Sequence, residues 1–295
     1  MNIQIQKPFL KWVGGKTQIL DEIIELIPKE MDNYHELFLG GGSVLFAVLS
    51  LQKENKIVIK NKIFAYDFNK DLINVFKHIQ NNFQSVQKYL NDLKCEYNSI
   101  EIFKNSNSKK SKESFYYSIR DKFNNFPDKQ SIEYSALFIF LNKTCFRGMH
   151  RRGPKGFNVP FGHYKQINFM DDTEIENISK LIQNVEFIHA DFQTSIIKIK
   201  KKDFVYMDPP YYPIDKKSFV SYNKDGFNLE MHDTLFELCN EKLKKKKIKF
   251  LFSNAKVDYV EKSFQDCKIK EIYARRAINR NNPGEKVKEI LIYNF

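Results

Sequence analysis

Short apolar segments that each end at an acidic or polar residue recur along this chain, and they constrain its fold most. They span residues 63–66, 185–189, 204–207 and 248–252, and lead to Asp67, Asp191, Asp208 and the Ser253-Asn254 pair. Apolar runs of this length predict strands buried on both faces, as in a parallel sheet covered by helices. Ligands of such sheets bind outside the carboxyl ends of the strands. We therefore expect the functional residues at these ends.

A fifth apolar segment, residues 36–39, runs into Gly40-Gly41-Gly42, and residues 43–52 then show a helical pattern. A glycine turn between a strand and a helix brings the backbone close to a ligand, and Asp67 is placed to accept hydrogen bonds from a ribose. The third glycine of a dinucleotide fingerprint is absent, so a purely structural turn is an equal alternative for this motif alone. Residues 270–273 and 289–293 are predicted to close one edge of the sheet as a hairpin.

The alternation of strands and helices stops between residues 82 and 183. Within this stretch, residues 104–165 hold thirteen Lys and Arg against four Asp and Glu, whereas the whole 295-residue chain holds 48 against 36. We therefore expect an α/β fold in which residues 1–81 and 184–295 form one domain, and residues 82–183 form a basic, mainly helical domain inserted into it.

Several classes of protein are excluded by composition. No apolar run approaches the roughly 18 residues of a membrane span, and the first residues lack the charged-then-apolar order of a signal peptide. The four cysteines are far apart, which fits a reducing cytoplasm and gives no metal motif. His150, His163 and His189 lack ligand spacing with a carboxylate, so no metal site is predicted.

Arginine is concentrated in two places. Six of the seven arginines fall in two clusters, which are Arg147, Arg151, Arg152 and Arg275, Arg276, Arg280. A guanidinium makes bidentate bonds to phosphate or to a guanine edge, which an ammonium cannot make, so nucleic acid is the leading partner class. Lysine runs such as residues 244–247 are equally well explained as solvated surface.

Residues 10–17 end like a phosphate-binding P-loop. However, Leu10 stands where that motif requires glycine. The missing glycine removes part of the backbone amide cradle, which argues against an NTPase.

The most specific motif is Asp208-Pro209-Pro210-Tyr211, directly after the segment 204–207. Two prolines alone would make a rigid turn, but an acid before them and an aromatic residue after them suit methylation of an exocyclic base amine. The Asp208 carboxylate and a proline-fixed carbonyl would accept both amino hydrogens, while Tyr211 would stack on the base. Such a base must be flipped out of a duplex to be reached.

Four short motifs and one single residue together resemble the pattern of one family. They are FLKWVGGK at 9–16, FLGGG at 38–42, Asp67, DPPY at 208–211 and FNVPFG at 157–162. This order resembles the Dam-like, alpha-group DNA adenine N6-methyltransferases, nearly from end to end. The resemblance implies a Rossmann-like fold that uses S-adenosylmethionine (SAM), with an inserted, mainly helical target-recognition domain that carries a β-hairpin.

The resemblance also assigns roles to single residues. It implies that the catalytic set is Asp208, Pro209 and Tyr211. It implies a cofactor set of Trp12, Lys16, Phe38, Gly40, Gly42, Asp67, Asp191, Phe192 and Asp208. The residues alone would assign only Asp67 and the DPPY loop, because Trp12 alone suggests a core residue and Lys16 a surface charge.

Residues 144–164 are similar to the family's target-reading region, in which Arg151 matches an arginine that reads a guanine. We expect DNA to be bound by Arg147, Arg151, Arg152, Lys155, Pro160 and Tyr164. Arg275, Arg276 and Arg280 have no firm counterpart in the family motifs, and our hypothesis is that they clamp DNA phosphates. Arg147 and Gly153-Pro154 depart from the pattern of members that read GATC. We expect a short palindrome of CATG or GATC type in double-stranded DNA, and a modification enzyme whose restriction endonuclease acts separately.

Other functions stay open at this point. Motifs like DPPY also serve enzymes that methylate RNA bases or protein glutamine, although the leading Asp and the basic insertion favour DNA adenine. A binding module with a decayed methyltransferase fold is a second alternative, but Asp67, Asp208 and Tyr211 are all intact. A basic enzyme that acts on acidic metabolites gives the arginine clusters no role.

Overall fold

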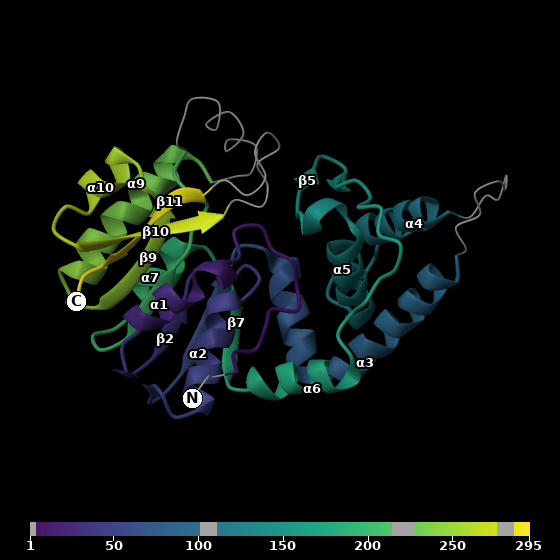
Figure 1. Cartoon of the computed structure of the whole chain (residues 1–295), viewed down its shortest axis with the longest axis horizontal. Coiled ribbons are helices and arrows are strands. Elements are labelled where there is room, and N and C mark those ends of the chain that lie inside the picture. The colour runs from purple at the N-terminus through teal and green to yellow at the C-terminus, as the bar shows by residue number, and fades with distance from the viewer. Residues whose placement is uncertain (1–3, 101–110, 214–226, 276–285) are drawn as a thin grey trace. The chain divides into compact units, whose positions relative to one another are not determined.

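The computed structural model describes residues 4–100, 111–213, 227–275 and 286–295. The chain divides into two compact units (Figure 1). The first unit comprises Met1–Ile5, Lys16–Phe68 and Asn184–Phe295, and the second comprises Gln6–Gly15 and Asn69–Gln183.

Seven strands among the described residues of the first unit form one sheet, in the order β10-β11-β9-β8-β2-β4-β7. The strands are β2 (Tyr34–Glu36), β4 (Ile63–Asp67), β7 (Val185–His189), β8 (Phe204–Met207), β9 (Lys249–Ala255), β10 (Lys268–Arg275) and β11 (Lys286–Tyr293). The five strands from β7 to β9 are parallel, whereas β11 runs antiparallel to both of its neighbours. A separate parallel pair joins β1 (Glu30–Met31) to β3 (Val58–Ile59). The expected mixed α/β fold and the closing hairpin at one sheet edge are confirmed.

Two strand predictions are wrong at their ends. The strand predicted at 36–39 ends at Glu36, because Leu37 and Leu39 are buried loop residues whose apolar side chains resemble a strand in sequence. The strand predicted at 248–252 continues to Ala255, because β11 pairs with it as far as that residue. Ser253 and Asn254 therefore lie inside β9 and do not follow it.

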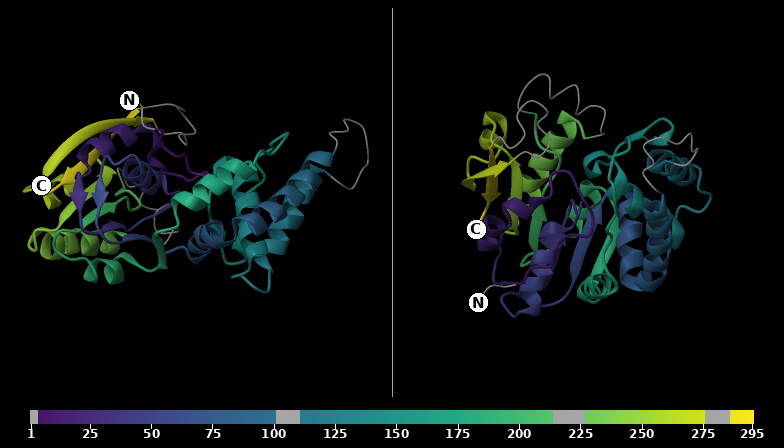
Figure 2. Two further views of the ribbon diagram at one scale, coloured as in Figure 1. Left: turned by 90° about the horizontal axis from the view of Figure 1, so that it is seen from below. Right: turned by 45° about the vertical axis from the view of Figure 1, so that its right-hand side comes forward.

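Helices cover both faces of this sheet. The connections from β2 to β4 and from β8 to β9 run in opposite directions, so right-handed crossovers place α2 (Ser43–Lys53) and α9 (Leu229–Leu238) on opposite faces (Figure 2). The remaining helices among the described residues of this unit are η1 (Lys16–Gln18), α1 (Leu20–Leu26), α7 (Phe192–Ile197), η3 (Cys239–Lys244) and α10 (Asp258–Ser263). The order of strands reverses between β2 and β8, and such a switch point is where an open α/β sheet binds its ligand.

The second unit is mainly helical. Its elements are α3 (Lys70–Ser99), α4 (Lys112–Asn124), α5 (Ile132–Thr144), η2 (Phe146–Gly148), α6 (Asp172–Leu181) and the hairpin of β5 (Arg152–Gly153) and β6 (Gly156–Phe157). Helix α5 is buried over nearly its whole length, and it packs against α3 and α4. Helices α3, α4, α5 and α6 each begin after an Asn, Ser or Asp whose side chain accepts a hydrogen bond from the first turn.

The limits of the compact units differ in part from the expected domain limits. The expected limit between residues 81 and 82 falls inside α3, where Asn82 has non-helical backbone angles, whereas the units divide after Phe68. The second unit also includes Gln6–Gly15, because the backbone of Lys11 exchanges two hydrogen bonds, 2.9 and 2.7 Å, with the Asn142 side chain. The other expected limit, between residues 183 and 184, coincides with a limit of the units.

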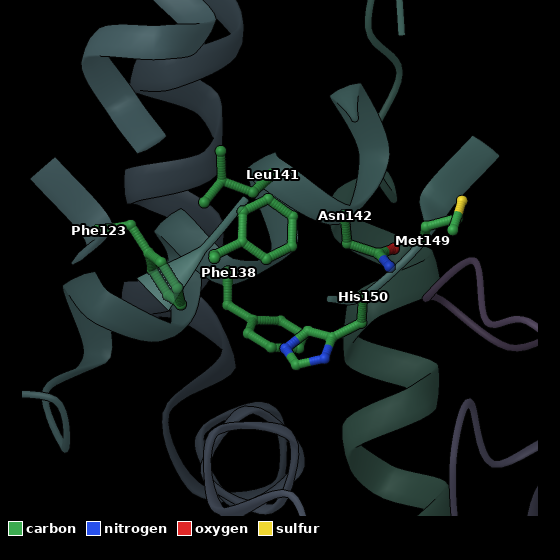
Figure 3. Close-up of a pocket in the computed structure, with 7 residues that line it drawn as sticks. Phe123, Phe138, Leu141, Asn142, Met149 and His150 are labelled. Atoms are coloured by element: carbon green, nitrogen blue, oxygen red, sulfur yellow. The ribbon is translucent and has the colours of Figure 1, made fainter. Parts of the chain in front are cut away.

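A small cavity lies inside the second unit (Figure 3). Phe123, Phe138, Phe157 and His150 are among the residues that line it, and its volume is about 10 Å³. This is about the space that one water molecule occupies, so the cavity is a packing defect and not a ligand site. Among the residues that the structure describes, no helix is long and apolar enough to span a membrane.

Candidate active site

The glycine turn after β2 is fastened to the end of β4. Gly40 and Gly42 have φ values of 50° and 74°, which glycine adopts without strain. The Asp67 carboxylate accepts a hydrogen bond of 2.9 Å from the Gly40 amide. Lys16 joins this group, because its amide donates to Ser43 Oγ, 3.1 Å away, at the start of α2. The structure therefore brings together four of the residues expected to bind the cofactor.

Asp208 follows β8 directly, on the strand next to β2. Its Oδ2 lies 2.6 Å from Lys16 Nζ, and both side chains are largely buried. The same Nζ lies 4.9 Å from the centre of the Tyr211 ring. Lys16 is only 5% exposed, so the interpretation of this lysine alone as a surface charge is wrong.

Two largely buried carboxyl groups, Asp208 and Glu36, lie at this switch point. Burial raises the pKa of Asp208 to about 6, although Lys16 lowers it, and Asp208 is therefore ionised at neutral pH. Burial raises the pKa of Glu36, at the end of β2, to about 8, although the Tyr34 hydroxyl donates to it. Glu36 is therefore protonated at neutral pH. Asp208 Oδ1 is buried and has no hydrogen-bond partner among the described residues, which makes it an available acceptor.

The rest of the DPPY loop is held by β9 and β11. The Tyr211 hydroxyl donates to Glu289 Oε2 at 2.8 Å and lies 3.1 Å from Ser253 Oγ. The Tyr212 amide donates to Asn254 Oδ1 at 3.0 Å. Sequence reasoning noted the Ser253-Asn254 pair but missed Glu289. The available signal was one acidic residue beside a run of buried apolar residues in β11.

The remaining residues expected at the cofactor lie in two places. The Phe38 ring packs on Phe192 in the first unit, with centroids 6.0 Å apart, and Asp191 accepts a 2.6 Å hydrogen bond from the Thr194 amide at the start of α7. Trp12 belongs to the second unit, where it stacks on His150 with centroids 5.6 Å apart. Burial lowers the pKa of His150 to about 4, so this stack is between neutral rings.

The predicted hairpin is present in the second unit. Arg151 and Arg152, at its start, have different partners. Arg151 is exposed, and its Nε donates to Asn158 Oδ1 at 2.8 Å. Arg152 forms an ion pair with Asp71 of α3 and donates to the Tyr134 hydroxyl at 3.0 Å. The charge of Arg152 is therefore already matched inside the unit.

The other residues expected to bind DNA are placed as follows. Arg147, Lys155 and Pro160 are exposed, and the Tyr164 hydroxyl accepts a 3.0 Å hydrogen bond from Lys11 Nζ. Arg276 and Arg280 lie outside the described residues, and Arg275 is described only as the last residue of β10.

Comparison with known proteins decides the family. The family described as D12 class N6 adenine-specific DNA methyltransferase matches residues 12–278. The chain belongs to this family. As a D12-class enzyme it is an adenine DNA methyltransferase, and DNA is its partner, so the resemblance found in the sequence is confirmed.

Relatives of this D12-class chain match it along nearly its whole length. It is 39% identical over 300 residues to type II methyltransferase M.MjaIII of Methanocaldococcus jannaschii, a match that covers 98% of this chain and 99% of the relative. It is 32% identical to a DNA adenine methylase of Haemophilus influenzae, which covers 97% of this chain and 92% of the relative. It is 30% identical to type II methyltransferase M1.LlaDCHI of Lactococcus lactis, over 98% of this chain and 95% of the relative.

Proposed function

We propose that this D12-class enzyme transfers the methyl group of SAM to N6 of an adenine flipped out of a short palindromic DNA site. The observation that carries this proposal is Asp208 at the switch point of the sheet. Its carboxylate is buried and ionised at neutral pH, and one oxygen is free of hydrogen bonds among the described residues. A fixed acceptor of this kind suits the amino group of a base.

The first unit supplies the chemistry in this proposal. When bound, SAM would supply the methyl group of its sulfonium and leave as the neutral thioether S-adenosylhomocysteine, and the methylated amine would lose one proton. Asp208 Oδ1 accepts one hydrogen of the adenine amine and the Pro209 carbonyl accepts the other, which frees the nitrogen lone pair for attack. Tyr211 stacks on the base and sets its angle. Lys16 keeps Asp208 ionised, because its ammonium lies 2.6 Å from the carboxylate.

The residues around the glycine turn fit SAM. The turn at Gly40 and Gly42 has positive φ values and opens helix α2, so it allows close approach of a ligand to the backbone. Asp67 bonds to that turn and is placed for a ribose hydroxyl. The adenine of SAM is proposed to contact Asp191 and the stacked rings of Phe38 and Phe192. For Trp12 the proposal rests on the family pattern alone.

The second unit is proposed to be the target-recognition domain. It contains the hairpin and the exposed Arg151, whose guanidinium plane is fixed by Asn158, as direct reading of a guanine requires. Arg147, Lys155, Pro160 and Tyr164 are proposed DNA contacts, and Arg275, Arg276 and Arg280 a phosphate clamp. For Arg152 the ion pair with Asp71 favours a different role, that of anchoring the hairpin to α3.

The cellular role is also a proposal. Two relatives are named type II methyltransferases, which supports a modification enzyme that works beside a separate restriction endonuclease in the cytoplasm. Another relative is named a DNA adenine methylase, and methylation without an endonuclease is the alternative.

Sequencing of treated DNA tests the proposed function. Unmethylated genomic DNA is incubated with the purified protein and SAM, and single-molecule sequencing then reports each modified base with its context. We expect N6-methyladenine at one four-base palindrome of CATG or GATC type. Methylation of a different base, or adenine methylation without any sequence context, would overturn the proposal.

A further inference from the structure

Glu289 is a buried acidic residue of β11 whose side chain contacts the loop that follows β8. It is 8% exposed and lies in β11 beside Ile290, Leu291 and Ile292, which are fully buried. Burying a carboxyl group costs free energy unless a partner forms a hydrogen bond or an ion pair with it. Its partner is the Tyr211 hydroxyl, which donates to Oε2 at 2.8 Å.

The register of the sheet explains why two strands reach the same hydroxyl. Glu289 pairs with Ala255, and Leu291 pairs with Ser253, so Glu289 and Ser253 are diagonal neighbours on one face of the β11–β9 pair. Ser253 Oγ lies 3.1 Å from the Tyr211 oxygen. Both contacts are at the end of the ring farthest from the backbone, where they restrain most strongly the swing of the side chain about its Cα–Cβ bond.

Lys16 lies close both to the Tyr211 ring and to the carboxylate of Asp208. Lys16 Nζ lies 4.9 Å from the centre of the Tyr211 ring and 2.6 Å from Asp208 Oδ2. Any change in the angle of the ring therefore changes its position relative to the groups that would hold the target base.

We propose that Glu289 is a positioning residue for methyl transfer, which holds the Tyr211 hydroxyl so that the ring presents a fixed face to the adenine. This inference rests on the proposed function, in which Tyr211 stacks on the base. Glu289 itself does not touch the base. Small errors in the orientation of a bound group can lower a rate by about a hundredfold, so a contact of this kind matters for turnover.

A double-mutant cycle on the full-length protein tests the inference. The variants are Glu289→Ala, Tyr211→Phe and the two combined, with kcat and KM measured for methylation of a DNA that the unaltered protein methylates. We expect each single change to lower kcat about tenfold or more while KM for SAM stays constant, and we expect the combined variant to be no slower than Tyr211→Phe. Glu289→Gln keeps an oxygen that accepts the hydrogen bond, so it should restore most of the rate.

A matched control and a pH profile separate positioning from a general loss of structure. Glu271 is an exposed acid on β10, paired with Lys256, and Glu271→Ala should leave kcat unchanged. Thermal unfolding shows whether each variant is folded. The Glu289 charge also raises the pKa of Asp208, so Glu289→Gln should shift the acidic limb of the kcat profile to lower pH. Lys16 lowers the pKa of Asp208 and Glu289 raises it, while Asp208 in turn raises the pKa values of Glu36, Tyr206 and Tyr211.

The outcomes are distinct. If the losses of the two single variants multiply in the combined variant, Glu289 does not act through the Tyr211 hydroxyl and the inference is overturned. An active, unperturbed Glu289→Ala variant overturns it as well. If the unaltered protein transfers no methyl group to adenine, the proposed function itself fails, and the inference fails with it.

Discussion

At the scale of single residues, two carboxyl groups at the ends of the neighbouring strands β2 and β8 differ in charge because their surroundings differ. Asp208 has a lysine 2.6 Å away and a pKa of about 6, whereas Glu36 accepts a neutral hydroxyl and has a pKa of about 8. At neutral pH the site therefore holds one carboxylate that can accept from an amine and one neutral acid beside it.

The rate of methyl transfer should depend on the charge of Asp208. The pKa of Asp208 is raised from its ordinary value of 3.8 to about 6, and only the ionised form accepts both from Lys16 and from the target amine. We expect the single-turnover rate to fall tenfold per pH unit below about pH 6. Quench-flow measurements between pH 5 and 8 check this, with SAM affinity followed in parallel. A rate that stays constant down to pH 5 contradicts it.

Stability should depend on the charge of Glu36. Its folded pKa of about 8 lies above the ordinary value of 4.5, so between these values the folded state binds more protons than the unfolded state. The free energy of unfolding should therefore fall as pH rises through this window. Glu36→Gln keeps an acceptor for Tyr34 and removes the titration.

Urea unfolding at pH 6 and pH 8.5 measures that difference. Each pKa unit corresponds to about 1.4 kcal/mol, so the decline in the unaltered protein should exceed that in Glu36→Gln by at least this amount. Equal declines in the two proteins would show that Glu36 does not titrate in this window.

At the scale of elements, the hairpin of β5 and β6 is anchored at two points. Arg152 pairs with Asp71 of α3, and the Asn124 side chain at the end of α4 exchanges two hydrogen bonds, 2.8 and 3.0 Å, with the Phe157 backbone. Arg151 is exposed, and its guanidinium donates to Asn158 Oδ1 and to the Asn158 carbonyl.

Neighbouring arginines should therefore give different phenotypes. Arg151→Ala should reduce discrimination at one base pair by about 1–3 kcal/mol and leave the free energy of unfolding unchanged. Arg152→Ala should destabilise the protein by about 1–2 kcal/mol, because Asp71 loses its charged partner. Methylation rates on single-substituted sites, together with urea unfolding, check both. If Arg151→Ala lowered the methylation rate equally on every site, Arg151 would be a phosphate contact and would not read a base.

The sequence predicted local features well, and it predicted contacts between distant segments poorly. Residues 204–207 were recognised because a continuous apolar run with a polar end leaves few alternatives. Leu37 and Leu39 led to a wrong end for the strand predicted at 36–39, because a buried loop can be as apolar as a strand. The pairing of Lys16 with Asp208 and that of Tyr211 with Glu289 join positions far apart in the chain, and no periodic pattern encodes them.

At the scale of the whole molecule, the excess positive charge should act through DNA phosphates. The expected clamp of Arg275, Arg276 and Arg280 is tested by replacing all three with Ala. Affinity should fall alike for every DNA sequence, and the slope of log K against log salt concentration should decrease by about 2–3. Fluorescence anisotropy at 50–200 mM salt measures both. An unchanged slope would show that these three arginines do not contact DNA phosphates.

Methyl transfer by Asp208→Ala tests the central claim most directly. Transfer to adenine in DNA and binding of SAM are measured on the same preparation, with the unaltered protein beside it. The loss of a buried acceptor that acts on the amine should lower transfer by about a thousandfold or more, while SAM still binds. Near-normal transfer by Asp208→Ala would contradict the account, since the chemistry would then not depend on this carboxylate.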